Sequence, residues 1–251
     1  MNNRLKTKII NAKGLGYREL NRLIKNAVTK GVKSIYLTNV NGQRYIGTGI
    51  NKKISINIDG VPGNDLGAFM DGCSINVAGN GEDGIGNTMN SGRIIINGDA
   101  GDIIGYSMRS GEIFIKGNVG YRVGIHMKSY KKMYPVIIIG ECARDFLGEY
   151  MAGGLLIVLG LNRKSKNPIV GSYCGTGMHG GKIFIRGNVE PWQLGKEVKV
   201  YEPNQDDLIL IGKYLRIYCK LFSLDFNSIT KTPFTKLLPG SSRPYGKLYA
   251  Y

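Results

Sequence analysis

The sequence predicts an all-β solenoid: a single-stranded parallel, right-handed β-helix with coils of about 19 residues and short α-helical caps at both ends. Three observations support this fold class. One unit of sequence recurs six times, each unit carries one short run of alternating apolar residues, and no helical pattern separates the units. Glycine, at 37 of 251 residues, is also about twice as frequent as the usual ~7%.

The repeat is built on a methionine, with one glycine three residues before it and a second glycine nine residues after it. Successive methionines are 19 residues apart for the first three steps and then 24 and 27 apart. In the fourth unit the second glycine comes four residues late, after an insertion. The predicted structural residues are Gly67, Met70, Gly79, Gly86, Met89, Gly98, Gly105, Met108, Gly117, Gly124, Met127, Gly140, Gly148, Met151, Gly160, Gly175, Met178 and Gly187.

Each repeat residue has an expected role. Isoleucines two residues apart, such as Ile94 and Ile96, share one face of a strand and stack from coil to coil into a continuous core. Methionines fill the interior, and glycines sit at corners with positive φ or close to the next coil. Asparagine or aspartate follows the closing glycine, as at Asn80 and Asp99, and is expected to take a left-handed corner conformation.

The chain divides into three expected segments. Residues 1–38 form an N-terminal helical cap and basic arm, residues 39–190 the parallel β-helix, and residues 191–251 a C-terminal helix and extended tail. Degenerate coils are expected before Gly60.

Two helices are predicted at the ends. Residues 17–30 place their apolar side chains on one stripe, and Gly31 suits the C′ position. Residues 205–220 have acidic residues in their first turn and basic residues later, as the helix dipole prefers. Helices at both ends would cover the edge strands of an open solenoid.

Charge and cysteine content narrow the class of protein. The chain carries 34 basic and 18 acidic residues, a net charge of +16, which favours acidic partners. Its four cysteines form no CxxC motif, so we expect reduced, mostly buried thiols rather than disulfides, zinc or an iron–sulfur cluster. Without an apolar run of about 18 to 20 residues or a signal-peptide pattern, the expected location is the cytoplasm.

Motifs that would indicate an active site are weak. Two GxGxxG strings, at 79–84 and 175–180, fall in register with the repeat, and no helix follows them, so they are interpreted as corners. Cys174 and His179 could in principle form a nucleophilic pair, but they lie inside such a corner without an orienting carboxylate. The row of residues after the methionines contains one carboxylate, Asp71, whereas a glycoside hydrolase needs two. No catalytic, cofactor-binding or metal-binding residue is predicted.

Two basic insertions interrupt the solenoid and are candidate partner-docking loops, because binding residues usually lie in loops that leave a regular scaffold. A purely solvated role is the alternative. Nucleic-acid binding has no support beyond charge, since no recognised motif is present. The docking residues are Lys128, Lys131, Lys132, Arg163, Lys164 and Lys166.

The iterated pattern GxxM followed by GxIxIxG resembles the GXGXG domain at the C-terminal end of the glutamate synthase large subunit. The resemblance extends to the YREL opening, NVNGQRYIGTG at 39–49, CGTGMHGGKIFIRG and the tail PFTKL…RPYGKLY. It covers nearly the whole chain and looks like the free-standing, archaeal-type form of that domain (glutamate synthase domain 3). The β-helical C subunit of formylmethanofuran dehydrogenase is similar through the repeat and is the second choice.

This resemblance implies a non-catalytic structural or assembly subunit of a glutamate synthase or related amidotransferase–FMN oxidoreductase complex in glutamate biosynthesis. Glutamine hydrolysis, FMN and the iron–sulfur cluster would belong to amidotransferase and synthase partner subunits, and this chain would bind no cofactor. Alternatives are a scaffold like the β-helical subunit of formylmethanofuran dehydrogenase, or a β-helix hydrolase or lyase that acts on an acidic substrate.

Overall fold

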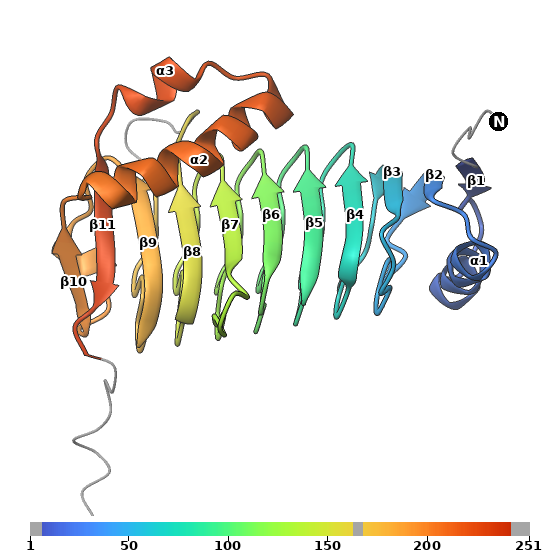
Figure 1. Cartoon of the computed structure of the whole chain (residues 1–251), viewed down its shortest axis with the longest axis horizontal. Helices are drawn as coiled ribbons and strands as arrows, with labels where there is room; N and C mark the ends of the chain where they lie inside the picture. The colour runs from blue at the N-terminus through green and yellow to red at the C-terminus, as the bar shows by residue number, and fades with distance from the viewer. Residues whose placement is uncertain (1–6, 163–167, 242–251) are drawn as a thin grey trace, which may run out of the picture.

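The computed structural model describes residues 7–162 and 168–241. Over these residues the chain forms a β-solenoid in which each coil adds one strand to a single eleven-stranded sheet (Figure 1). The order in the sheet follows the sequence from β1 to β9, and β11 and then β10 complete it. The strands are β1 (Thr7–Asn11), β2 (Ser34–Asn41), β3 (Ser55–Val61), β4 (Asp71–Val77), β5 (Ser91–Ile96), β6 (Gly111–Ile115), β7 (Pro135–Ile139), β8 (Ala152–Val158), β9 (Gly180–Arg186), β10 (Val198–Tyr201) and β11 (Phe234–Pro239).

The register of the sheet confirms the predicted parallel solenoid. Strands β1 to β9 pair in parallel, and equivalent residues of the repeat face each other, as Ile75, Ile94 and Ile113 do. Strands β2 and β3 continue this ladder before the first repeat methionine, which confirms the degenerate coils before Gly60. Because β1 and β2 belong to the ladder, the solenoid starts inside the segment 1–38.

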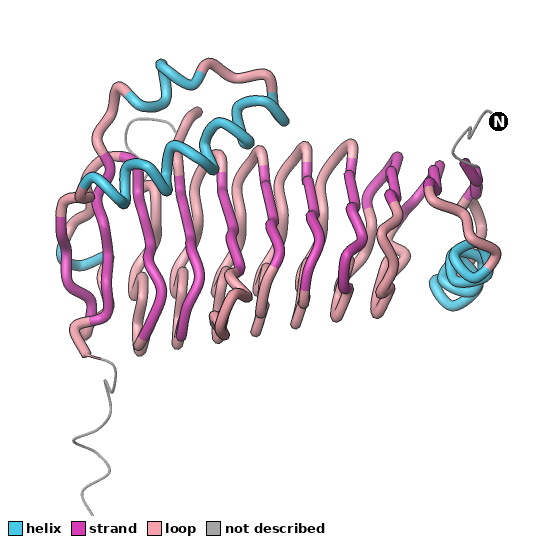
Figure 2. Tube along the Cα trace, in the orientation of Figure 1, coloured by secondary structure: helices cyan, strands magenta, loops and turns pink. Residues whose placement is uncertain are grey.

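The other sides of each coil are turns rather than strands (Figure 2). Residues five, three and one positions before each methionine take left-handed conformations; in the coil that ends at Met108 they are Ile103, Gly105 and Ser107, with φ of 51°, 68° and 52°. Because every second residue is left-handed, the backbone curls here and cannot extend into a strand. The middle position is glycine, and a Cβ at Gly105 would overlap Cδ1 of Ile137 in the next coil.

The asparagines and aspartates after the closing glycines have a different role from the predicted one. The prediction that they take left-handed corners is wrong, because neither Asn80 nor Asp99 has a positive φ. Each instead accepts a backbone hydrogen bond from the next coil: Asp99 N–H donates to Asn80 Oδ1 at 2.9 Å, and Asn118 N–H donates to Asp99 Oδ1 at 2.6 Å. These side chains connect neighbouring coils where no strand pairing exists.

The interior and the place of the first helix in the sequence follow the prediction, but the edge strand β1 is not covered, since four of its five residues are exposed. All six repeat methionines are fully buried in one continuous aliphatic core. Helix α1 (Tyr17–Thr29) adds Leu20, Ile24 and Ala27 to this core and so closes its N-terminal end. Gly31 has a φ of 80°, as expected for the C′ position.

Helix α2 (Gln205–Phe222) forms where predicted but lies across the outer face of the sheet rather than over its end (Figure 1). Leu215 and Tyr218 pack in a second core with outward side chains of β6 to β9, including Phe114 and Phe184. The short helix α3 (Phe226–Thr230) follows it. The C-terminal edge is covered by β11 and β10, which pair antiparallel; the rest of the predicted extended tail, residues 242–251, lies outside the described residues.

Candidate docking surfaces

The repeat residues form the frame on which surface residues are placed. Each methionine is inside the core, and each glycine three positions before a methionine adopts a positive φ. Because successive coils repeat this geometry, residues at one repeat position form a straight row, with a spacing of about 4.8 Å along a parallel ladder. Function on such a frame depends on the side chains that point outward.

The basic loop, residues 128–134, leaves the solenoid before β7. Its lysines Lys128, Lys131 and Lys132 are exposed. Tyr130 and Met133 exchange backbone hydrogen bonds of 3.1 and 2.9 Å, so the loop is a tight hairpin. Lys131 Nζ lies 5.2 Å from the centre of the Tyr130 ring. Lys131 and Lys132 therefore lie on the hairpin, whereas Lys128 is still part of the coil, because its N–H donates to the carbonyl oxygen of Met108 at 3.0 Å. Arg163, Lys164 and Lys166 lie outside the described residues.

The Cys174–His179 pair has no geometry or electrostatics for a nucleophile. Cys174 is fully buried, and burial raises the pKa of its thiol to about 12, so the thiolate needed for attack is not formed at neutral pH. His179 is exposed, and its Nδ1 lies 3.4 Å from the carbonyl oxygen of Gly177. Within the described ranges, no three His, Cys, Asp or Glu side chains are grouped to hold a metal ion.

In the row of residues after the methionines, the first three members, Asp71, Asn90 and Arg109, form side-chain hydrogen bonds. Ser91 Oγ donates to Asp71 at 2.5 Å, and Arg109 Nη1 donates to Asn90 at 3.4 Å. Asp71 is the one carboxylate of this row, so the row holds no facing pair of carboxylates, which the hydrolase alternative would require.

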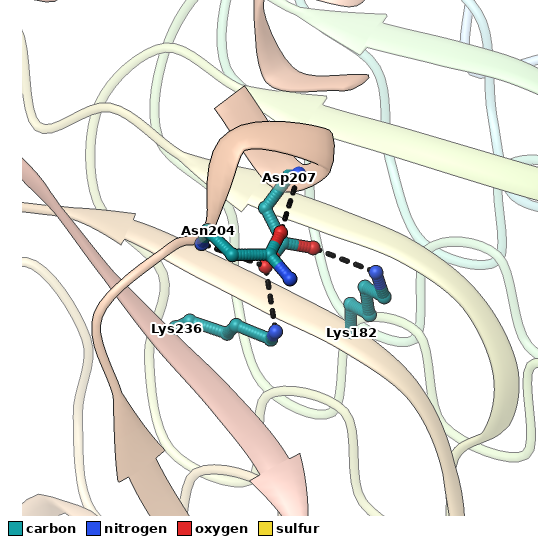
Figure 3. A network of polar contacts seen from close by, with 4 residues as sticks. All are labelled: Lys182, Asn204, Asp207 and Lys236. Atoms are coloured by element: carbon teal, nitrogen blue, oxygen red, sulfur yellow. Dashed lines mark hydrogen bonds and ion pairs between the residues drawn. The ribbon is translucent and has the colours of Figure 1, made fainter. Parts of the chain in front are cut away.

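A buried carboxylate fastens helix α2 to the sheet (Figure 3). Asp207 accepts hydrogen bonds from Lys182 Nζ and Lys236 Nζ, both at 2.6 Å, and forms a reciprocal capping box with Asn204. Burial alone would raise the pKa of Asp207, but the hydrogen bonds from the two lysines outweigh burial and lower it. With both oxygens bound, the group links α2 to β9 and β11 and has a structural role.

A groove of about 730 Å³ lies between α2, α3, β10 and β11. Its walls include the apolar side chains of Val200, Leu208, Ile211 and Phe226. Gly212, in the middle of α2, also faces this groove, and a Cβ there would meet no atom within 4 Å. The groove offers apolar contact rather than an acid–base pair.

Sequence reasoning missed a cluster of rings on the turn side of the C-terminal coils. We call it the aromatic face; its rings are Tyr106, Tyr121, His126, Phe146, Tyr150 and Tyr173, and the guanidinium groups of Arg122 and Arg144 lie against two of them. His126 and Tyr150 stack with centroids 5.3 Å apart, and Tyr106 meets the His126 ring edge-on at 6.0 Å. These rings come from three successive coils and form one column.

A second column runs beside the first. The rings of Phe146 and Tyr173 stack at 5.0 Å, and the Arg122 guanidinium lies 4.5 Å from the centre of the Phe146 ring. Arg122 Nε also pairs with Glu149 Oε2 at 3.0 Å. The signal in the sequence was present: aligned on the methionines, rings recur one position upstream, at His126 and Tyr150, and five positions upstream, at Phe146 and Tyr173.

Comparisons with known proteins agree with this architecture. The family described as GXGXG motif matches residues 18–200. An uncharacterized protein of Methanocaldococcus jannaschii is 47% identical in an alignment of 249 residues that covers 96% of this chain and 95% of that protein. In the part of the chain that the structure describes, no helix has the length and apolar character to span a membrane.

A solved structure shares the fold. It is a chain of the formyltransferase/hydrolase complex from Methylorubrum extorquens, determined in complex with methylofuran. The superposition has a TM-score of 0.61 and covers 90% of this chain and 89% of that chain. The sequence identity is 18%, so this likeness establishes a common fold.

Proposed function

This chain belongs to the GXGXG motif family, and from that premise we propose that it is a non-catalytic structural and assembly subunit of a cytoplasmic glutamate synthase or related amidotransferase–FMN oxidoreductase complex. The observation that carries the proposal is the family match over residues 18–200. In this proposal FMN and the iron–sulfur cluster are bound by partner subunits, and this chain binds no cofactor.

The geometry supports a scaffold role. Nine parallel strands and their interlocked turns hold surface residues at fixed spacing, so partners on different coils would be kept in register. The Cys174 thiol is buried, and in the row after the methionines Asp71 and Asn90 accept hydrogen bonds from Ser91 and Arg109, so these groups supply no reactive group to a substrate. The proposed mechanism is therefore geometric: the solenoid orients the active sites of other chains.

Docking is assigned to the basic loop. Lys131 and Lys132 present positive charge on a hairpin that leaves the solenoid, and exposed Lys128 lies in the coil just before it. An acidic partner surface would be drawn to it, and such complementarity sets the encounter rate and orientation more than the affinity. Contacts of this kind between carboxylates and lysines weaken as the salt concentration rises.

A second candidate is a scaffold subunit in a formyl-transfer complex, similar to the β-helical subunit of formylmethanofuran dehydrogenase. The observation in its favour is the shared fold with a chain of the formyltransferase/hydrolase complex. The two candidates differ in their partners: the first requires amidotransferase and FMN/iron–sulfur chains, and the second requires formyl-transfer chains.

The test is purification of the native assembly from its own cells, with the bound chains identified by mass spectrometry and the visible spectrum recorded. A yellow-brown complex with amidotransferase and flavoprotein chains supports the first candidate; formyl-transfer chains support the second. A colourless chain recovered alone contradicts both.

A charge-reversal pair tests the docking loop. Lys131→Glu with Lys132→Glu should reduce co-purification of partners. Lys52→Glu with Lys53→Glu is the matched control, because these lysines are also adjacent, exposed and placed just before a strand of the solenoid. Equal recovery of partners with both variants would show that the loop does not dock them.

A further inference from the structure

The N-terminal edge of the sheet is open. Strand β1 stands first in the order of the sheet, and in the part of the chain that the structure describes it pairs with β2 alone (Figure 1). The side chain of Ile9, in the middle of this strand, is 66% exposed. Helix α1 adds its apolar side chains to the core and leaves the edge of β1 uncovered. An edge strand of this kind presents backbone groups to which another strand can bond.

The hydrogen bonds of β1 identify the backbone groups at this edge. Ala12 N–H, one residue past the strand, donates to the carbonyl oxygen of Thr38 in β2 at 2.8 Å. Successive residues of a parallel strand direct their N–H and C=O groups to opposite sides. Lys8 and Ile10 therefore face β2 as Ala12 does, and the N–H and C=O of Ile9 point away from the sheet. Ile9 thus offers a donor, an acceptor and an apolar side chain to a further strand.

A lysine takes the place of isoleucine in the core row at this edge. Lys8 pairs with Ile35, and the row continues through Ile56 to Ile75. The three isoleucines are fully buried, whereas Lys8 is exposed. A charge at an inward-facing position of an edge strand opposes pairing with another apolar strand. A strand that places a carboxylate opposite Lys8 meets no such opposition, because opposite charges across a strand pair attract.

The N-terminal end of the molecule also holds most of the positive charge. Residues 7–59 carry ten basic and two acidic residues, a net charge of +8. The other described residues, 60–162 and 168–241, carry 17 basic and 16 acidic residues, a net charge of +1. Of the two carboxylates at the basic end, Glu19 lies in α1 and Asp59 in β3. The electrostatic potential at this end therefore attracts acidic groups.

We propose that β1 binds an extended acidic segment of a partner protein, which adds one strand to the sheet. The segment carries a carboxylate opposite Lys8 and an apolar side chain opposite Ile9, because side chains of a strand alternate between its two faces. Hydrogen bonds to the N–H and C=O of Ile9 supply affinity, and the side-chain pairs supply the choice of sequence.

Charge and the open edge together select this occupant. Two copies of this chain, each at +16, repel each other. A nucleic acid matches the charge but not the backbone groups and apolar side chain of Ile9. The site is also separate from the basic loop. Lys52 and Lys53 lie outside it as well, since β3 is about 14 Å from an added strand at ~4.8 Å per strand, beyond the Debye length of ~8 Å.

The probe is a fluorescent peptide, about seven residues long, in which glutamate and valine alternate. Fluorescence anisotropy measures its binding to the full chain, and NMR measures amide hydrogen exchange in the complex. The expected result is saturable binding that slows exchange of the Ile9 amide, because this N–H donates to the added strand. Two control peptides should bind at least ~10-fold more weakly. One has every backbone nitrogen methylated, which keeps the charge but removes the N–H donors, and the other has lysine in place of glutamate.

Variants separate the backbone contact from the charge. Ile9→Pro removes the outward N–H, which proline is tolerated to do at a strand edge, and should weaken peptide binding ~10-fold. Ile9→Thr keeps this N–H and should weaken binding less than ~3-fold. Lys8→Glu should weaken binding ~10-fold, whereas Lys199→Glu, the same change at an exposed lysine of the opposite edge strand β10, should alter it less than ~2-fold. Circular dichroism and thermal unfolding check the fold of each variant.

Four results would overturn the proposal: no saturable binding of the peptide, equal binding of its methylated form, unchanged exchange at Ile9, or full binding by folded Ile9→Pro. Displacement of the peptide by a single-stranded oligonucleotide, without protection of Ile9, would assign the basic end to nucleic acid. Filaments formed by the chain alone would assign the edge to a second copy. The outcome is independent of the proposed function, because the peptide is tested on the chain itself, whatever complex the native assembly contains.

Discussion

Replacement of Asp207 by alanine should destabilise the protein by about 4 kcal/mol. The substitution leaves Lys236, whose side chain is 11% exposed, without its buried partner, and breaking a buried pair costs about 3 kcal/mol. Lys182 is more exposed, and its pair adds no more than about 1 kcal/mol. The lost capping box at Asn204 adds a similar small amount. Helix α2 should then detach from β9 and β11 more readily.

Urea unfolding followed by circular dichroism measures this free energy. Asp206→Ala is the matched control: Asp206 lies in the same first turn but is exposed, so its loss should cost only about 0.5 kcal/mol through the helix dipole. A difference of less than about 1 kcal/mol between the two variants would refute the assignment of Asp207 as the attachment of α2.

The same variant has a predictable pH dependence. The pKa of Asp207 is lowered in the folded protein, so its contribution to stability is complete above the unfolded value of about 3.9 and is lost as the pH falls through the folded value. The stability gap between wild type and Asp207→Ala should therefore be constant at neutral pH and narrow below about pH 4. A gap that stays constant into acid would contradict this linkage.

Two further predictions concern buried groups. Gly105→Ala should destabilise the protein by about 3 kcal/mol in urea unfolding, because a Cβ at a φ of 68° would overlap Ile137. Gly212→Ala is the control: this glycine lies in open space within α2, so its replacement should stabilise the protein by about 1 kcal/mol. If both substitutions changed the stability in the same direction, the close packing of coils at Gly105 would be refuted. In the native protein a thiol reagent should modify the half-buried Cys142 well before Cys174, since burial both shields Cys174 and raises its pKa to about 12. Mass spectrometry of labelled peptides measures the order of modification, and labelling of Cys174 first would contradict the prediction.

The solenoid was predictable from the sequence because the same contacts repeat from each coil to the next. Each coil touches mainly its neighbours, so a period in the sequence is also the register of the sheet. The methionines and the alternating isoleucines therefore identified the core, as at Met108 and Ile113, and both are fully buried. The apolar stripe of 17–30 with Gly31 after it, and the acidic first turn near Asp207, located both helices for local reasons, independent of the rest of the chain.

Tertiary structure alone decided where α2 lies and which rows of side chains act together. The helix covers the outer face because outward residues there change from polar, as at Asn76 in β4, to apolar, as at Phe114 in β6, and an apolar face must be buried. Asp207 meets lysines 25 and 29 residues away, a distance that local patterning does not encode. The sequence by itself determined the coil, the core and the helices, since those depend on local and periodic contacts. The attachment of α2 and the stacking of Phe146 on Tyr173 depend on side chains that meet only after the coils are stacked.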